Sequence, residues 1–343
     1  MVYIFRLNMK RKVIIIAEAG VNSNGNLKIA KRLIDIAADA KVDYIKFQTF
    51  KANKLVTKKA QRAKYQIKNT GSKESQHKLL KSLEMTEQMH YKIKEYCKRK
   101  KIKFFSTGFD IESVKFLLKL GMKIIKIPSG EINNVPFLKY IGKLNLPIIL
   151  STGMATMDEI NFALKTLTKS GSRKKNISIL HCTTQYRTPL KDVNLNAMHA
   201  IRKKFNINVG YSDHTLGLEV PIAAVAMGAN IIEKHFTTDR KLTGPDHMAS
   251  LEPKELKEMV KLIRNTEKAL GSKIKKPTKI ELENIKIARK SIVALKKIKK
   301  GDTFSDKNLT VKRPGTGLSP KLWDKVLGRK SKFYFEEDDF IKI

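Results

Sequence analysis

Short runs of apolar and often β-branched residues alternate along most of the chain with longer segments whose apolar residues recur at helical spacing. In NLKIAKRLIDIAADA, for example, Leu27, Leu33 and Ala37 share one helical face, while Lys28 and Asp35 lie off it. Eight runs have the length of a buried strand: VIIIA at Val13, YIKF at Tyr44, KFFS at Lys103, KIIKI at Lys123, PIIL at Pro147, ISIL at Ile177, INVGY at Ile207 and NIIEKH at Asn230. Eight strand-then-helix units predict an α/β fold, a (β/α)8 TIM barrel over about residues 10–272.

One connection in this pattern is unusually long. Residues 51–86 separate the second run from the next helical segment and are rich in Lys, Gln and Ser. A stretch of this length inside a compact barrel indicates either a lid over a polar site or an ordinary solvated insertion.

Length and charge restrict the classes of protein that fit. The chain has 343 residues and a formal net charge of +38. The length suits one large domain with a small appendage. The lysines are scattered, and no arginine-rich arm or nucleic-acid-binding motif accompanies them. We therefore predict a solvated surface that favours anionic substrates, and no nucleic-acid partner.

Cysteine content and hydropathy indicate the compartment. The chain has two cysteines, Cys97 and Cys182, so no disulfide framework is expected and a reducing cytoplasm fits. No segment has the length and apolarity of a membrane span, and the apolar run in MVYIFRLNMKRK is too short for a signal peptide. Met9 is an alternative start to Met1.

Polar side chains follow nearly every predicted strand. Because active sites of this barrel lie at the carboxyl ends of its strands, these residues form one predicted site. They are Glu18, Asn22, Lys46, Gln48, Ser106, Thr107, Lys126, Ser129, Glu131, Ser151, Thr152, His181, Ser212, Asp213, His214, Glu233, Lys234 and His235.

Two histidines occupy matching places in this set. His214 follows the seventh strand in GYSDHTLG, and His235 ends the eighth in EKHFTTD. Neighbouring strands lie about 4.8 Å apart, which lets both imidazoles approach one divalent cation. Either histidine alone would be read as a hydrogen-bonded core residue, but the paired placement favours a Lewis-acid metal site. Mn²⁺, Mg²⁺, Co²⁺ and Zn²⁺ all suit nitrogen and oxygen donors.

Two lysines are predicted to point into the same mouth. Lys46 and Lys126 belong to strands two and four, near Ser129, Ser151 and Ser212. Two ammonium groups with several hydroxyls suit a small anionic substrate that carries phosphate and carboxylate. The alternative is a pair of lysines with buried stems and solvated heads at the rim.

The ordered motifs resemble one known family. IIAEAGVNSNG, KFQTFKA, FSTGFD, KIIKIPSGEINNVP, ILSTGM, LHCTTQYRTP, GYSDHTLG, EKHFTTD and GPDHMAS are similar to those of the N-acetylneuraminate (sialic acid) synthase family. The segment ARKSIVALKKIKKGDTFSDKNLTVKRPGTGLSP resembles the small, mainly β SAF (antifreeze-like) domain that such enzymes carry. The resemblance implies a catalytic barrel over residues 1–272, a linker over 273–285 and a SAF domain over 286–343.

The resemblance implies condensation of phosphoenolpyruvate with N-acetylmannosamine to give N-acetylneuraminate and phosphate. A divalent ion on His214 and His235, foremost Mn²⁺ with Mg²⁺ or Co²⁺ as alternatives, would polarise the sugar aldehyde. Glu233 would hold a water beside it, and Glu131 is the candidate acid or base. Positions that match phosphoenolpyruvate ligands are Lys46, Thr107, Lys126, Ser129, Ser151 and Ser212; those that match sugar ligands or proton carriers are Gln48, Glu131, Tyr186 and Asp246.

This sequence departs from the family pattern at four places. Ser23 replaces a histidine, Gly108 often a proline, and Gln185 and Arg187 an acid and a proline around the tyrosine. These changes spare the two histidines and the lysines, so they leave the predicted reaction intact and bear on which sugar is used. A related enzyme class that shares nearly every motif uses 2,4-diacetamido-2,4,6-trideoxymannose to make legionaminate, and it is the alternative prediction.

The remaining expectations concern assembly and other classes. Arg313 matches a family arginine that reaches the partner subunit's sugar, which predicts a domain-swapped homodimer in which each SAF domain caps the other barrel. An ice-binding role, suggested by the antifreeze-like name alone, would not need the metal and phosphate residues.

Overall fold

The chain divides into two compact units. The structure, a computed structural model, describes residues 12–343, so the alternative start at Met9 lies outside the described residues. The first unit ends at Gly271, and the second covers Ser272–Ile343. Within the described residues, none of the helices is long and apolar enough to cross a membrane.

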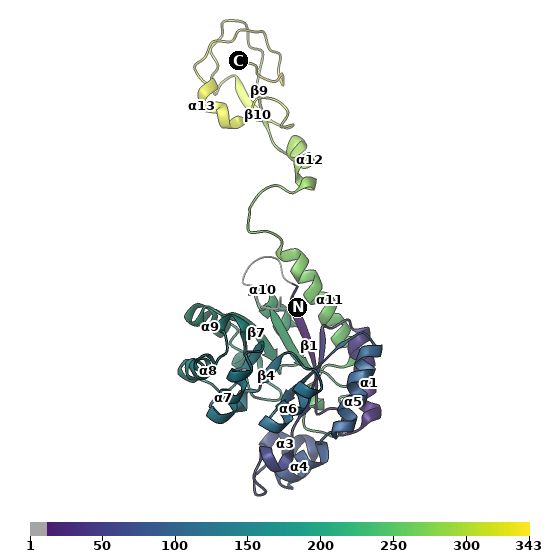
Figure 1. Ribbon diagram of the computed structural model, residues 1–343. Helices are drawn as coiled ribbons and strands as arrows, with labels where there is room; N and C mark the ends of the chain where they lie inside the picture. Colours follow the sequence, from purple (N-terminus) through teal and green to yellow (C-terminus); the bar gives the residue numbers. More distant parts are fainter. Residues whose placement is uncertain (1–11) are drawn as a thin grey trace. The chain divides into compact units, whose positions relative to one another are not determined.

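Eight parallel strands form the centre of the first unit (Figure 1). Their hydrogen-bonded order is β3-β2-β1-β8-β7-β6-β5-β4, so β3 and β4 stand at its two ends and the barrel is nearly closed. This arrangement confirms the predicted (β/α)8 fold. The strands are β1 (Ile14–Gly20), β2 (Tyr44–Thr49), β3 (Lys103–Gly108), β4 (Ile125–Ile127), β5 (Ile148–Ser151), β6 (Ile177–His181), β7 (Asn208–Asp213) and β8 (Ile231–His235).

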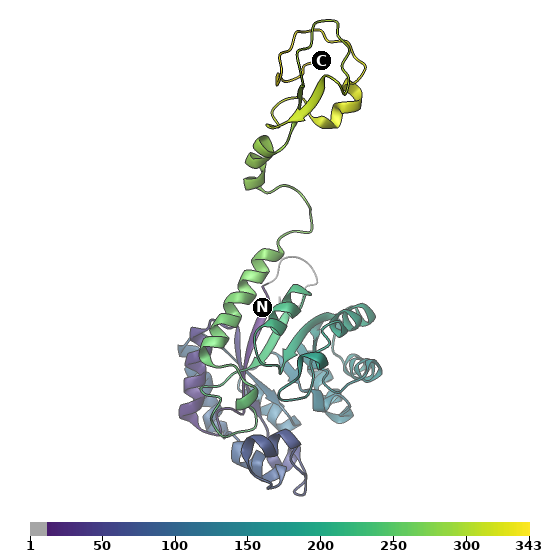
Figure 2. The same cartoon turned by 180° about the vertical axis from the view of Figure 1, so that it is seen from behind.

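A helix follows each strand and lies on the outer side of the barrel (Figure 2). Asn26 caps the first of them through its side-chain oxygen, which accepts hydrogen bonds from Lys28 and Ile29. The face of this helix that carries Leu33 and Ala37 is buried against the strands, as its spacing predicts. The helices are α1 (Leu27–Asp39), α5 (Glu87–Arg99), α6 (Ile111–Lys119), α7 (Val135–Leu144), α8 (Met157–Lys169), α9 (Ala197–Phe205), α10 (Glu219–Ala226) and α11 (Pro253–Leu270).

The long connection after β2 is a helical insertion. It contains α2 (Ala52–Leu55), α3 (Lys64–Thr70) and α4 (Gln76–Leu83). Leu79 and Leu83 of α4 are buried with Val21 and Phe50, which follow β1 and β2. The insertion therefore lies over the carboxyl ends of these strands, as expected of a lid and not of a fully solvated loop.

The second unit has a small core of its own. Strands β9 (Ser291–Ala294) and β10 (Leu309–Lys312) are antiparallel, and single bridges such as Ile298 to Phe335 extend the pairing. Ile292, Phe304 and Leu309 are buried between these segments and α13 (Trp323–Val326). Helix α12 (Lys279–Ala288), which Thr278 and Glu281 cap, occupies much of the segment predicted as a linker, residues 273–285.

Candidate active site

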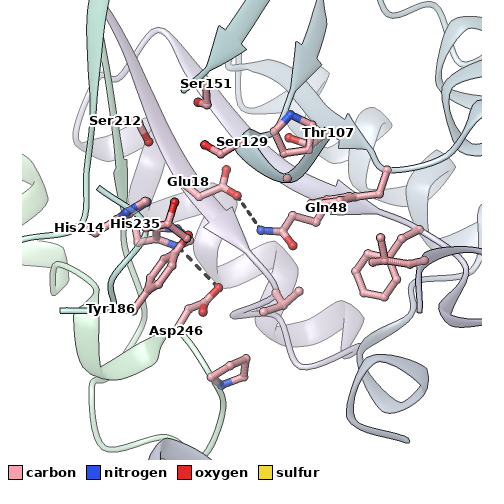
Figure 3. A pocket seen from close by; sticks show the side chains of 18 of the residues that line it. Glu18, Gln48, Thr107, Ser129, Ser151, Tyr186, Ser212, His214, His235 and Asp246 are labelled. Carbon is pink, nitrogen blue, oxygen red and sulfur yellow. Dashed lines mark hydrogen bonds and ion pairs between the residues drawn. The ribbon is translucent and has the colours of Figure 1, made fainter. Parts of the chain in front are cut away.

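A cavity of about 380 Å³ lies at the carboxyl ends of the barrel strands. Most of the predicted site residues of the barrel line it, and Figure 3 shows many of these side chains converging. Six residues that the sequence predicts at the mouth do not line the cavity: Asn22, Ser106, Thr152, His181, Asp213 and Lys234. Strand alternation explains the convergence, because residues two apart on a strand share a face. Glu233 and His235 of β8 therefore point into the cavity together, and Lys234 between them points away.

Four buried charges form a network at the base of the cavity. The parallel register places Glu18 of β1 beside both Lys46 of β2 and His235 of β8. Lys46 Nζ lies 2.7 Å from Glu18 Oε2 and 3.7 Å from Glu233 Oε1. Lys126 Nζ donates to the same Glu233 oxygen at 2.7 Å. Two cations and two anions balance here, so an arriving anion competes with these carboxylates for the ammonium groups.

Burial and pairing act against each other on the pKa values of this network. Burial would raise the pKa of Glu233, but the charges of Lys126 and Lys46 outweigh it and hold the pKa at about 2. Burial lowers the pKa of Lys126 more than Glu233 raises it. For Lys46, the nearby charges of Glu18 and Glu233 overcome burial and raise the pKa. Burial raises the pKa of Glu18, which Lys46 only partly offsets.

Hydroxyl groups surround the two ammonium groups. Thr107 Oγ1 accepts a hydrogen bond from Lys46 Nζ at 2.9 Å, and Ser212 Oγ lies 3.3 Å from Glu233 Oε1. Ser129 Oγ accepts from the backbone N–H of Gly153 at 2.9 Å. Ser151 Oγ is buried and has no hydrogen-bond partner within residues 12–343, a costly arrangement unless a ligand or water completes it.

The two histidines have the geometry of neutral nitrogen ligands. Their ring centroids are 5.5 Å apart. His214 Nδ1 lies 2.7 Å from the carbonyl oxygen of Thr183, which can only accept, so the proton is on Nδ1 and Nε2 keeps its lone pair. Burial lowers the pKa of His214, and burial together with His214 lowers that of His235 much further. His235 Nδ1 is buried without a hydrogen-bond partner among the described residues.

These features fit a two-histidine metal site. Within residues 12–343, no group of three or more His, Cys, Asp or Glu is arranged to hold a metal ion. Two histidines leave coordination positions open for water or substrate, as catalytic metal sites do and closed structural ones do not.

An aromatic stack and two further acids complete the mouth. The Tyr186 ring lies 4.2 Å from that of His214 and 5.1 Å from that of Tyr65 in the insertion. Burial, with a smaller contribution from Glu18, raises the pKa of Asp246 to about 7. Glu131 accepts from the side chain of Asn134, and Gln48 Nε2 donates to Glu18 Oε1 at 3.2 Å.

Some sequence expectations change in the structure. The sequence predicts Glu18 at the mouth but gives it no role. In the structure it is 2% exposed and pairs with Lys46, a contact that only the strand register reveals. Tyr65 was missed, because its partner Tyr186 is distant in sequence. Lys234 was expected in the mouth but is buried in the barrel wall against Asp213. Arg313 belongs to the second unit, where its Nε donates to the carbonyl of Ala288.

The four residues that depart from the family pattern differ in their burial and in their position relative to the cavity. Ser23 is buried beside Met85, and Gln185 and Arg187 are exposed and outside the cavity lining. A Cβ at Gly108 would lie 2.8 Å from a methyl group of Val114, so the close approach of α6 favours glycine there.

The fold and this site are those of a barrel enzyme that carries a second, small domain. Comparison with known proteins gives its family. Residues 33–275 match the NeuB family, and residues 289–343 match the SAF domain. The chain belongs to the NeuB family.

Individual relatives cover nearly the whole chain. An N,N'-diacetyllegionaminic acid synthase from Campylobacter jejuni is 52% identical over 97% of this chain and 99% of its own. A protein of the same name from Legionella pneumophila is 46% identical over 92% of this chain and 89% of its own. A crystal structure of N-acetylneuraminic acid (sialic acid) synthetase from Leptospira borgpetersenii in complex with citrate is 37% identical, with a TM-score of 0.71 over 82% of this chain and 94% of that one.

Proposed function

We propose that this chain is an N,N'-diacetyllegionaminate synthase, which condenses phosphoenolpyruvate with 2,4-diacetamido-2,4,6-trideoxymannose and releases phosphate. The identities of 52% and 46% to proteins of this name support it. The first expectation from sequence, N-acetylneuraminate synthesis from N-acetylmannosamine, gives way to this alternative. The coarser conclusion is common to both: the chain is a synthase of sialic-acid-like sugars.

The observation that carries the proposal is the pair of buried lysines beside four hydroxyl side chains in one cavity. Lys46 and Lys126 are each 3% exposed, so their positive charges act in a poorly solvated site. Such charges suit the phosphate and carboxylate of phosphoenolpyruvate, and Thr107, Ser129, Ser151 and Ser212 supply further hydrogen bonds. When the substrate's anionic groups bind the lysines, Glu18 and Glu233 lose part of their pairing and become better proton acceptors.

The sugar is assigned to the mouth of the cavity, beside the phosphoenolpyruvate site. Gln48, Tyr186 and Asp246 line this part and offer an amide, a phenol and a carboxyl group. Asp246, with a pKa of about 7, exchanges a proton readily near neutral pH. Glu131 remains the candidate acid or base on the other side of the mouth.

A divalent metal ion, foremost Mn²⁺ with Mg²⁺ or Co²⁺ as alternatives, is part of the proposal. His214 and His235 would hold it, and it would supply Lewis-acid polarisation of the sugar's carbonyl group. Glu233 pairs with Lys126 and lines the same cavity as the two histidines, so it can hold a water for addition to C2 of phosphoenolpyruvate.

The function is tested by phosphate release. Purified protein with Mn²⁺ and phosphoenolpyruvate is assayed with the diacetamido sugar, with N-acetylmannosamine and with no sugar. Release that depends on the diacetamido sugar supports the proposal. Release with N-acetylmannosamine alone would return the assignment to N-acetylneuraminate synthesis.

The partner proposal is a homodimer in which Arg313 contacts the sugar bound to the other subunit. A planar, permanently charged guanidinium suits such an oriented contact. Chains with His235→Ala are mixed with chains with Arg313→Ala under conditions of subunit exchange. A mixed dimer then has one site with both defects and one with neither, so activity should rise well above that of either variant. Exchange without recovery would place Arg313 outside the partner's site.

A further inference from the structure

The cavity has an apolar side that the reaction described above leaves unused. We give the name apolar wall to six of the apolar side chains that line it: Phe50, Leu55, Val56, Leu79, Leu80 and Phe109. Most come from α2 and α4 of the insertion or from the residues next to them. Leu55, Leu80 and Phe109 are partly buried and pack against the buried Phe50 and Leu79, and the two phenylalanine rings meet edge to face at 6.0 Å.

The insertion is fixed against the mouth, which gives the apolar wall a defined position. The Tyr65 ring stacks 5.1 Å from Tyr186, and Asn69 Nδ2 donates to the carbonyl of Pro245 at 2.7 Å. Both Tyr186 and Pro245 line the cavity as well. The backbone N–H of Ala52 donates to Glu84, which ties the two ends of the insertion together. A wall held in this way is preorganised for its ligand.

An apolar surface beside a carbohydrate site discriminates between methyl and hydroxyl groups. Burying a methyl group against such a surface is favourable, because apolar area is removed from water. Burying a hydroxyl there without a hydrogen-bond partner is unfavourable, because the hydroxyl loses its hydrogen bonds to water. A sugar that carries hydroxyl groups along its length gains little from such a wall, whereas a deoxygenated, doubly acetylated sugar presents methyl groups to it.

We propose that the apolar wall is the specificity element of this enzyme, and that it selects a sugar whose deoxygenated carbon and acetyl methyl groups face it. This inference rests on the proposed function and deepens it. It assigns sugar choice to the insertion between β2 and α5, while the charged network acts on phosphoenolpyruvate and the histidines act at the carbonyl group that both sugars share.

The test places one polar group on the wall at a time. Val56→Thr adds a hydroxyl at nearly unchanged volume, and Leu80→Asn adds an amide. Leu27→Asn serves as the control, because Leu27 is also a partly buried leucine but packs on the outside of the barrel. For each protein, kcat/KM is measured for the diacetamido sugar and for N-acetylmannosamine, together with the KM of phosphoenolpyruvate and the thermal midpoint.

The wall variants should lower kcat/KM for the diacetamido sugar about 10-fold, leave that for N-acetylmannosamine level or higher, and leave the KM of phosphoenolpyruvate unchanged. Leu27→Asn should leave the ratio between the sugars unchanged. If Val56→Thr and Leu80→Asn lower both sugars in parallel, or change neither, the wall only packs the insertion and the inference is wrong. A wild-type enzyme that ignores the diacetamido sugar would instead refute the proposed function.

Discussion

Asp213 and Lys234, which immediately precede the two cavity-lining histidines His214 and His235, form an ion pair with both side chains fully buried. The two residues are direct partners in the register of β7 and β8. Lys234 Nζ also donates to the carbonyl of Thr215 at 2.8 Å, and Asp213 Oδ1 accepts from the backbone N–H of Thr215 at 2.9 Å. The pair therefore joins the strand ends from which His214 and His235 project, on the side away from the cavity.

Breaking this pair should destabilise the fold. Lys234→Met leaves a buried, unpaired carboxylate, so the free energy of unfolding should fall by about 3–5 kcal/mol. Adding Asp213→Asn to this variant should restore part of the lost free energy of unfolding, because the unpaired charge is removed. Denaturant unfolding measures the stability of both variants. Because Asp213 and Lys234 position the two histidines, the double variant should also have a lower kcat than the wild type. Its KM for phosphoenolpyruvate should stay unchanged. Glu258→Gln, which breaks an exposed pair with Lys261, is the control and should change stability by less than about 1 kcal/mol. An unchanged kcat in the double variant would restrict the pair to a structural role.

Activity should require a divalent metal held by the two histidines. Removing the metal with a chelator should abolish turnover, and Mn²⁺ should restore it. His214→Ala and His235→Ala should lose most of the rate and bind Mn²⁺ weakly by calorimetry, yet keep a wild-type circular dichroism spectrum, because both side chains line a cavity. The exposed His199 provides the control His199→Ala. Full turnover in excess chelator would show that the reaction does not need a metal ion.

The lysines should control phosphoenolpyruvate and not the sugar. Lys46→Met and Lys126→Met each remove a charge-assisted hydrogen bond of about 1.5–3 kcal/mol, so the KM of phosphoenolpyruvate should rise roughly 10- to 150-fold. Steady-state kinetics with both substrates varied separates the two KM values. The control is Lys54→Met, which removes an exposed lysine that pairs with Glu112. It should change neither of the two KM values. A rise confined to the sugar's KM would show that the two substrate positions are exchanged.

The strands and the polar side chains that follow them were predictable because both depend on local pattern. Eight apolar runs have strand length, and strand alternation sends Lys46, Lys126 and His235 to one mouth. The contacts among them were not predictable, because they depend on the register between strands. Glu18 shows this, since only the pairing of β1 with β2 places it against Lys46.

The insertion was harder to predict, because its three helices are short and charged. Their packing depends on distant partners, such as Tyr65 on Tyr186 and Leu79 on Phe50. A single sequence holds no local signal for such contacts. The segment predicted as a linker is partly helical for a local reason, the capping box of Thr278 and Glu281.

Acid should weaken the fold through Asp43. Its carboxylate accepts from the backbone N–H of Ile15 at 2.9 Å and lies 2.6 Å from Arg264 Nη2. Burial alone would raise the pKa of Asp43, but the hydrogen bond from Ile15 and the charges of Lys12 and Arg264 lower it below its usual value. A depressed folded-state pKa stabilises the fold above the unfolded-state pKa of about 3.9, and this contribution is lost as pH falls through the folded-state value.

Asp43→Asn should therefore reduce the free energy of unfolding at pH 7 by about 1–3 kcal/mol and flatten its decline below about pH 4. Urea unfolding across this pH range measures both effects. Asp39→Asn, at a 77% exposed carboxylate, should follow the wild-type profile. Equal stability of wild type and Asp43→Asn at pH 7 would contradict this assignment.

The most direct test of the central claim is a competition between the two sugars. The enzyme, with Mn²⁺ and limiting phosphoenolpyruvate, is given equal concentrations of 2,4-diacetamido-2,4,6-trideoxymannose and N-acetylmannosamine, and the products are quantified by mass spectrometry. We predict that N,N'-diacetyllegionaminate exceeds N-acetylneuraminate by about 10- to 100-fold, the range that methyl-against-hydroxyl discrimination in an apolar site allows. A mixture dominated by N-acetylneuraminate, or phosphoenolpyruvate left unconsumed, would contradict the account.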